Sequence, residues 1–158
     1  MTPTATRILA ASAARIELET AIKAPLAMVW KAVVEQPDAW WVSELRCVPD
    51  SKIVFAPQAG GHFVEQNESG ASLLWFTVIA IEPPHSVNFA GAIAPPFGGP
   101  CQVYLHLHLE QHAAGTLAKL ISSMHGHLDE GMLPEIESGW RLLLEKGLKR
   151  FVETGQRV

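Results

Sequence analysis

Apolar and polar residues alternate along much of the chain, which is the pattern of strands with one buried face. The first such segment runs from Arg15 to Ile22. Further segments bounded by Gly, Pro or Asn predict strands at 52–56, 61–66, 71–81, 86–90, 101–111 and 116–125. Because most connectors between them are short, we expect an antiparallel meander.

Helical spacing of apolar residues occurs twice in clear form. After Pro25, a stripe at positions 26, 29, 30 and 33 predicts a helix, and a second short helical segment is expected at 36–42. A long helix is predicted over 134–152, with Gly155 as its stop signal. The one long connector, 91–100, is rich in Ala, Pro and Gly and is expected to form a mobile apolar flap.

Length and composition favour one ordinary globular domain. The chain has 158 residues, of which 48% are hydrophobic and 18% are charged. We expect a flexible leader at 1–13 and a domain at 14–156. A net charge of −4 without a basic run argues against a nucleic-acid partner, and no apolar run is long enough to span a membrane. Cys47 and Cys101 are expected to be buried, reduced thiols in a cytoplasmic protein.

Several short motifs occur in an order that is typical of one superfamily. They are Ala24-Pro25 with Val29-Trp30, Ala39-Trp40-Trp41, Gly60-Gly61-His62-Phe63, Val78 to Pro84, Gly115-Thr116, and Gly139-Trp140 with Leu142-Leu143, Leu148-Lys149 and Glu153-Thr154-Gly155. Together they cover essentially the whole domain and resemble the START-like (SRPBCC) superfamily. The terminal helix is similar to that of homologues of the heat-shock chaperone ATPase activator.

This resemblance implies an α+β helix-grip fold, in which a curved antiparallel sheet wraps around the C-terminal helix and leaves an internal cavity. It implies a hydrophobic or aromatic small molecule, lipid-like or polyketide-like, as the partner, and no cofactor. Trp140 and Leu144 lie one turn apart on the predicted helix and would share its sheet-facing side. The candidate ligand-binding residues are Trp40, Trp41, Phe63, Trp75, Phe89, Leu105, Leu120, Trp140 and Leu144.

An enzyme is the alternative, since some members of the superfamily are polyketide cyclases. No nucleophile elbow, dinucleotide-binding or metalloprotease motif is present in the sequence. A general acid or base projecting into the cavity could come from His62 or Glu65, although strand alternation lets only one of them point inward. A cyclase, dehydratase or hydrolase would use such a group. A protein-interaction role ranks last.

Two further features leave alternatives open. The strand at 73–81 is apolar on both faces, so alternation cannot say which face lines the cavity; the other face, with the loop around Phe97, makes a homodimer plausible. Two histidine pairs, His106 with His108 and His125 with His127, have the spacing for one strand face. Pairing of the last two strands would separate the pairs by about 15 Å, so we expect no metal site.

Overall fold

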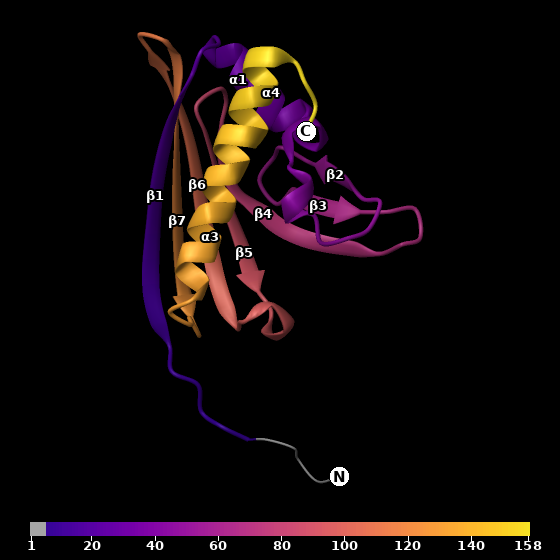
Figure 1. The fold of residues 1–158 in the computed structure, drawn as a ribbon, viewed down its shortest axis with the longest axis vertical. Coiled ribbons are helices and arrows are strands. Elements are labelled where there is room, and N and C mark those ends of the chain that lie inside the picture. The colour runs from indigo at the N-terminus through magenta and orange to yellow at the C-terminus, as the bar shows by residue number, and fades with distance from the viewer. Residues whose placement is uncertain (1–5) are drawn as a thin grey trace.

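A computed structural model describes residues 6–158. Seven strands form one antiparallel sheet in the order β1-β7-β6-β5-β4-β3-β2. The strands are β1 Ser12–Ile22, β2 Lys52–Phe55, β3 His62–Gln66, β4 Ser72–Glu82, β5 Ser86–Ile93, β6 Cys101–His112 and β7 Gly115–Gly126. The curved sheet, the C-terminal helix and the short helices after β1 confirm the predicted α+β helix-grip arrangement (Figure 1).

The helical elements lie at two places in the chain. Between β1 and β2 come α1 Leu26–Glu35, α2 Pro37–Trp40 and the 3-10 turn η1 Ser43–Leu45. The short turn η2 Pro95–Phe97 follows β5. A continuous C-terminal helix is made of α3 Met132–Leu142, a π-helical segment η3 Leu143–Lys149 and α4 Arg150–Thr154. It runs across one face of the sheet, with α1 near its far end (Figure 1).

Strand register places one apolar row beneath the C-terminal helix. Leu18, Leu120, Leu107, Val87 and Ile81 are successive cross-strand partners from β1 to β4. Every second residue is buried on this inner face from Cys101 to Leu109 in β6 and from Thr116 to Met124 in β7, as the alternation predicts. The sheet and the terminal helix therefore share one hydrophobic core.

The long helix is held close to α2 by a glycine. Gly147 lies so near the Trp40 carbonyl that a Cβ atom built at position 147 would be 2.4 Å from that oxygen. At the C-terminal end Gly155 adopts a left-handed conformation with φ of 72°. This conformation ends the helix, as predicted for a C-terminal glycine. The sequence predicted this helix, whereas nothing in its spacing indicated the π-helical segment.

The structure corrects several details of the sequence prediction. The first part of the predicted flap is strand, because Gly91 and Ile93 pair with Val103 and Cys101; only residues 94–100, which include the 3-10 turn η2, lie outside the strands. The second helical segment is confined to Pro37–Trp40. Cys101 is buried, but Cys47 is exposed, contrary to expectation. Residues 1–5 of the predicted leader lie outside the described residues.

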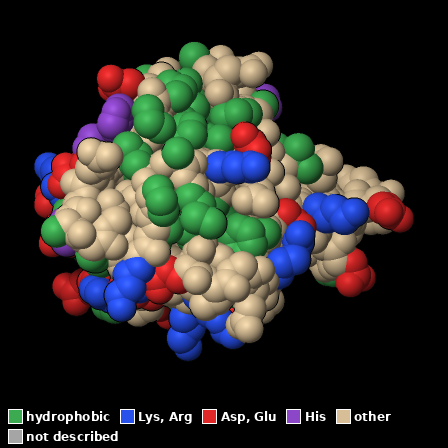
Figure 2. Space-filling view, turned by 90° about the horizontal axis from the view of Figure 1, so that it is seen from above, with side chains coloured by type: hydrophobic (Ala, Val, Ile, Leu, Met, Phe, Trp, Pro, Cys, Tyr) green, Lys and Arg blue, Asp and Glu red, His purple; other side chains and the backbone are tan. Residues whose placement is uncertain are grey.

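Charged side chains are dispersed on the end of the molecule where α1 and α4 lie. Lys and Arg there alternate with Asp and Glu around exposed apolar side chains, so this face has no continuous basic surface (Figure 2). Within residues 6–158, none of the helices has both the length and the apolar character needed to cross a membrane.

Candidate functional site

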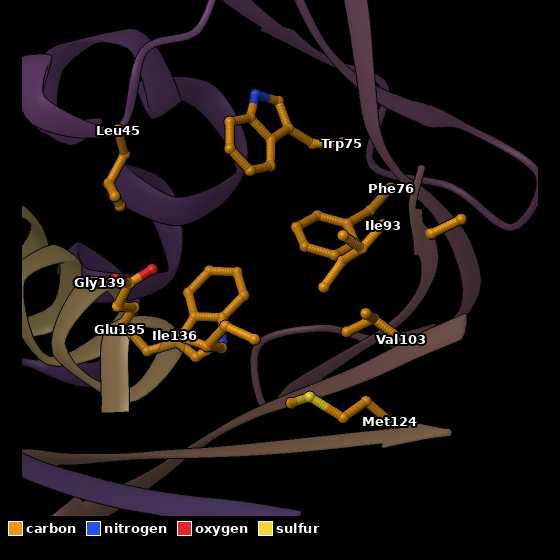
Figure 3. Close-up of a pocket in the computed structure, with 11 residues that line it drawn as sticks. Leu45, Trp75, Phe76, Ile93, Val103, Met124, Glu135, Ile136 and Gly139 are labelled. Atoms are coloured by element: carbon orange, nitrogen blue, oxygen red, sulfur yellow. The ribbon is translucent and has the colours of Figure 1, made fainter. Parts of the chain in front are cut away.

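An open cavity of about 290 Å³ lies between α3 and the sheet. Its wall is formed by Leu45, Trp75, Phe76, Ala92, Ile93, Val103, Met124, Glu135, Ile136, Gly139 and Trp140. Side chains from η1, the sheet and the helix converge on this one space (Figure 3). The volume is at the lower end of the range for small-molecule sites, about 300 to 1,000 Å³.

A β-bulge supplies two adjacent aromatic residues to the cavity wall. Phe63 pairs with Phe76, but the next residue of β3, Val64, pairs with Leu74, so β4 carries one extra residue at Trp75. The extra residue shifts the alternation of β4 locally. Trp75 and Phe76 consequently line the same cavity, which strict alternation would forbid.

A second bulge follows in the same strand. Val78 pairs with Phe89 and Ala80 with Asn88, which leaves Ile79 as an extra residue. Val78 is buried, whereas Ile79 is 52% exposed on the outer face. Each bulge changes whether the odd-numbered or the even-numbered residues of β4 point inward. No single face of this strand therefore lines the cavity along its whole length.

Glu65 fixes the orientation of Trp75. Its carboxylate is fully buried and accepts a hydrogen bond from Trp75 Nε1 at 3.0 Å. The same carboxylate accepts hydrogen bonds from Ser51 Oγ at 2.7 Å and from the backbone N–H groups of Val48 and Cys47 at 2.8 and 3.2 Å. Burial raises the pKa of Glu65, but these hydrogen bonds outweigh it and the pKa is lowered.

The two candidates for a general acid or base, His62 and Glu65, lie in different surroundings. Glu65 is buried on the inner face of β3, whereas His62 is exposed. Of the two residues, only Glu65 therefore points inward. Four donors occupy the Glu65 carboxylate. It is therefore a positioning residue for the cavity wall and for the 47–51 loop. The one ionisable group in the wall is Glu135, which is exposed at the mouth.

Trp140 is the residue through which the helix meets the cavity. It is 8% exposed and its ring centroid lies 6.0 Å from that of Phe76. Its Nε1 is buried without a hydrogen-bond partner among the described residues. Trp41 Nε1 and Ser122 Oγ are unpartnered in the same way.

The structure divides the predicted ligand-binding residues into two groups. Trp75 and Trp140 lie in the cavity wall. The other seven predicted residues lie deeper in the core, where they and Trp140 line a separate void of about 40 Å³. They are Trp40, Trp41, Phe63, Phe89, Leu105, Leu120 and Leu144. Contact of these residues with a ligand stays a prediction. The void has room for about one water molecule and is entirely apolar.

Sequence reasoning missed most of the cavity wall. Val103 and Met124 belong to the inward faces of β6 and β7, so alternation could have included them. Ile136 belongs to the apolar stripe of the terminal helix. Ile93 belongs to the connector that was predicted to be an apolar flap, whereas no sequence signal pointed to Leu45.

The histidines of β6 lie on the outer face of the sheet. The rings of His106 and His108 stack with centroids 5.9 Å apart, and His106 Nδ1 lies 2.7 Å from Asn88 Oδ1. Burial and the neighbouring His108 lower the pKa of His106. Within residues 6–158, no three His, Cys, Asp or Glu side chains gather in a group that could hold a metal ion.

The comparisons with known proteins concern the fold. No family model matches the chain. A stretch of 93 residues is 33% identical to glycerophosphocholine phosphodiesterase from Mus musculus, and it covers 53% of this chain and 14% of that protein. The chain thus spans about a seventh of the length of this curated relative.

Solved structures match over nearly the whole chain. An uncharacterized protein from Rhizobium leguminosarum is similar with a TM-score of 0.71 and 19% identity, over 93% of this chain and 99% of that one. The Aha1 dimer from Colwellia psychrerythraea is similar with a TM-score of 0.62 and 20% identity, over 90% of this chain and 98% of that one. At such identities the likeness shows the fold alone, which is the α+β helix-grip-like arrangement described above.

Proposed function

We propose that this protein binds a hydrophobic or aromatic small molecule in the cavity beneath α3. The observation that carries the proposal is the cavity wall, in which Trp75, Phe76 and Trp140 stand among aliphatic side chains and Glu135 is the only charged residue. Burial of apolar ligand surface would supply the affinity, at roughly 25 cal/mol per Å² before the costs of association.

The cavity volume sets the size of the expected ligand. A cavity of about 150 Å³ is large enough for benzene. The present cavity, about 290 Å³, is roughly twice as large and suits a two-ring aromatic compound or a short aliphatic chain. It is open at one side, so a longer molecule could leave one end in solvent.

The neutral dye N-phenyl-1-naphthylamine is a suitable first probe, because its fluorescence rises in apolar surroundings. We expect saturable binding with a Kd of about 1 to 100 μM. Ile136→Trp, which places a larger side chain in the cavity wall, should weaken binding at least tenfold. The thermal midpoint of the variant should stay close to that of the wild type. Absence of saturable binding, or equal affinity in the two proteins, would contradict the proposal.

We further propose that the protein forms a homodimer through the outer face of β2, β3 and β4. Val54, Val64 and Leu74 are cross-strand neighbours there, and Val54 and Leu74 are 49% and 50% exposed. Such an apolar row on a surface favours association. The solution dimer of the Aha1 protein supports a dimer for this fold, without indicating its interface.

Sedimentation equilibrium tests the homodimer. The wild type should sediment at about twice the chain mass of 17.2 kDa, and Leu74→Lys should sediment as a monomer. Phe97→Ser is the matched control, because Phe97 is 60% exposed but lies in the loop after β5. A monomeric wild type would refute the dimer, and a monomeric Phe97→Ser with a dimeric Leu74→Lys would move the interface to that loop.

A further inference from the structure

One charged side chain borders the otherwise uncharged cavity. Glu135 lies in the first turn of α3, is exposed, and contributes to the wall opposite the side chains of the sheet (Figure 3). It takes part in none of the ion pairs among residues 6–158. A carboxylate at the rim of an apolar cavity thus has a negative charge without a positive partner in the described chain.

The surrounding sequence reinforces this negative charge. Residues 128–139, which lead into α3 and form its first turns, contain Asp129, Glu130, Glu135 and Glu137 but no Lys or Arg. The nearest basic residue on the helix, Arg141, is already paired with Glu137 at 2.8 Å. The loop at 94–100, which follows the cavity-lining residue Ile93 and approaches Met132 at Gly98, contains no charged residue. An anionic ligand head would therefore meet repulsion at the entrance.

The rings of the cavity wall act in the same direction. Trp75, Phe76 and Trp140 present aromatic surfaces, and the ring centroids of Trp75 and Phe76 are 6.4 Å apart. The face of an aromatic ring attracts an ammonium group within about 6 Å of its centroid. Aromatic rings beside a carboxylate form a surface that is complementary to an organic cation with an apolar body.

We propose that the ligand of this cavity is a hydrophobic amine, with its apolar body against the aromatic wall and its ammonium group at the mouth beside Glu135. The inference rests on the proposed function, because it assigns a chemical class to the ligand of the same cavity. At the mouth the ammonium group keeps part of its hydration, so binding avoids the large cost of burying an unsolvated charge.

Three naphthalene compounds test this assignment with one ring system and three head charges: 2-naphthylmethylamine, 2-naphthylmethanol and 2-naphthoate. By titration calorimetry at pH 7 we expect the amine to bind about tenfold more tightly than the alcohol. The carboxylate should bind most weakly. Glu135→Gln should remove most of the advantage of the amine over the alcohol.

Glu137→Gln is the matched control, because Glu137 lies on the same helix, is outside the cavity wall and is already paired with Arg141. It should leave the order of the three affinities unchanged. If the amine binds no more tightly than the alcohol, or if Glu135→Gln does not reduce its advantage, the assignment to amines is overturned while binding of the alcohol still supports the cavity as a binding site. If none of the three compounds binds, the proposed function fails as well.

Discussion

Gly147→Ala should destabilise the protein by about 2 to 3 kcal/mol, although the same substitution in an exposed helix usually stabilises it by about 0.5 to 1 kcal/mol. The added Cβ would be 2.4 Å from the Trp40 carbonyl oxygen and 3.4 Å from Val42 Cγ1. The carbonyl cannot easily retreat, since Trp40 Nε1 donates to the Ala32 carbonyl at 2.8 Å. The C-terminal helix must therefore move away from α2.

Gly139→Ala on the same helix is the control for this prediction. A Cβ at position 139 would meet only the Leu45 Cδ2 atom, at 3.4 Å, which is ordinary contact with the end of a flexible side chain. We expect this variant to be neutral or more stable by up to about 1 kcal/mol. Urea denaturation followed by circular dichroism measures both. Similar stabilities for the two variants would show that the contact between Gly147 and Trp40 does not limit helix packing.

The parts of the fold that were predictable from sequence are those in which a simple period persists. β6 alternates from Cys101 to Glu110 and β7 from Gly115 to His125, and the terminal helix repeats its apolar stripe to Val152. In β4 the bulges at Trp75 and Ile79 each add a residue. Strict alternation assigns neighbouring residues of a strand to opposite faces. It therefore could not predict that Trp75 and Phe76 line the same cavity.

The position of the cavity was less predictable than the fold. The candidate residues are large and apolar, and most of them fill the core so well that only a small void remains between them. The cavity lies nearer the N-terminal end of the helix, where Gly139 and Ala92 leave space. Whether large side chains line a space or fill it depends on their combined packing in three dimensions, which no single-strand pattern contains.

The role of Glu65 also depends on tertiary structure. Sequence reasoning placed it on a strand beside the cavity, but its donors come from the 47–51 loop and from β4. The Cys47 and Val48 N–H groups belong to a segment without secondary structure, so the carboxylate supplies the acceptor that their backbone lacks. Removal of its charge should therefore affect the loop and the orientation of Trp75 together.

Glu65→Gln should reduce the free energy of unfolding by about 2 to 4 kcal/mol at pH 7, because the amide keeps the shape of the side chain but turns an NH₂ group toward N–H donors. Glu68→Gln is the matched control, because Glu68 is exposed in the turn between β3 and β4. This substitution should reduce the free energy of unfolding by less than about 0.5 kcal/mol. Urea denaturation followed by tryptophan fluorescence gives both values. A loss below about 1 kcal/mol for Glu65→Gln would mean that the amide replaces the carboxylate without penalty.

The pH dependence of stability gives a second readout for the same variant. Since hydrogen bonding lowers the pKa of Glu65 in the folded state, its contribution is present above the pKa of the unfolded chain and is lost as the pH falls through the folded pKa. The wild type should therefore lose stability from about pH 5 downward, and Glu65→Gln should lose less over that range. Part of the loss of stability at low pH must persist in Glu65→Gln, because the pKa of Asp38 is lowered as well. Burial alone would raise the pKa of Asp38, but hydrogen bonds from Ile53 and Arg46 outweigh this effect. Identical acid profiles for the wild type and the variant would show that the Glu65 carboxylate does not stabilise the fold through its charge.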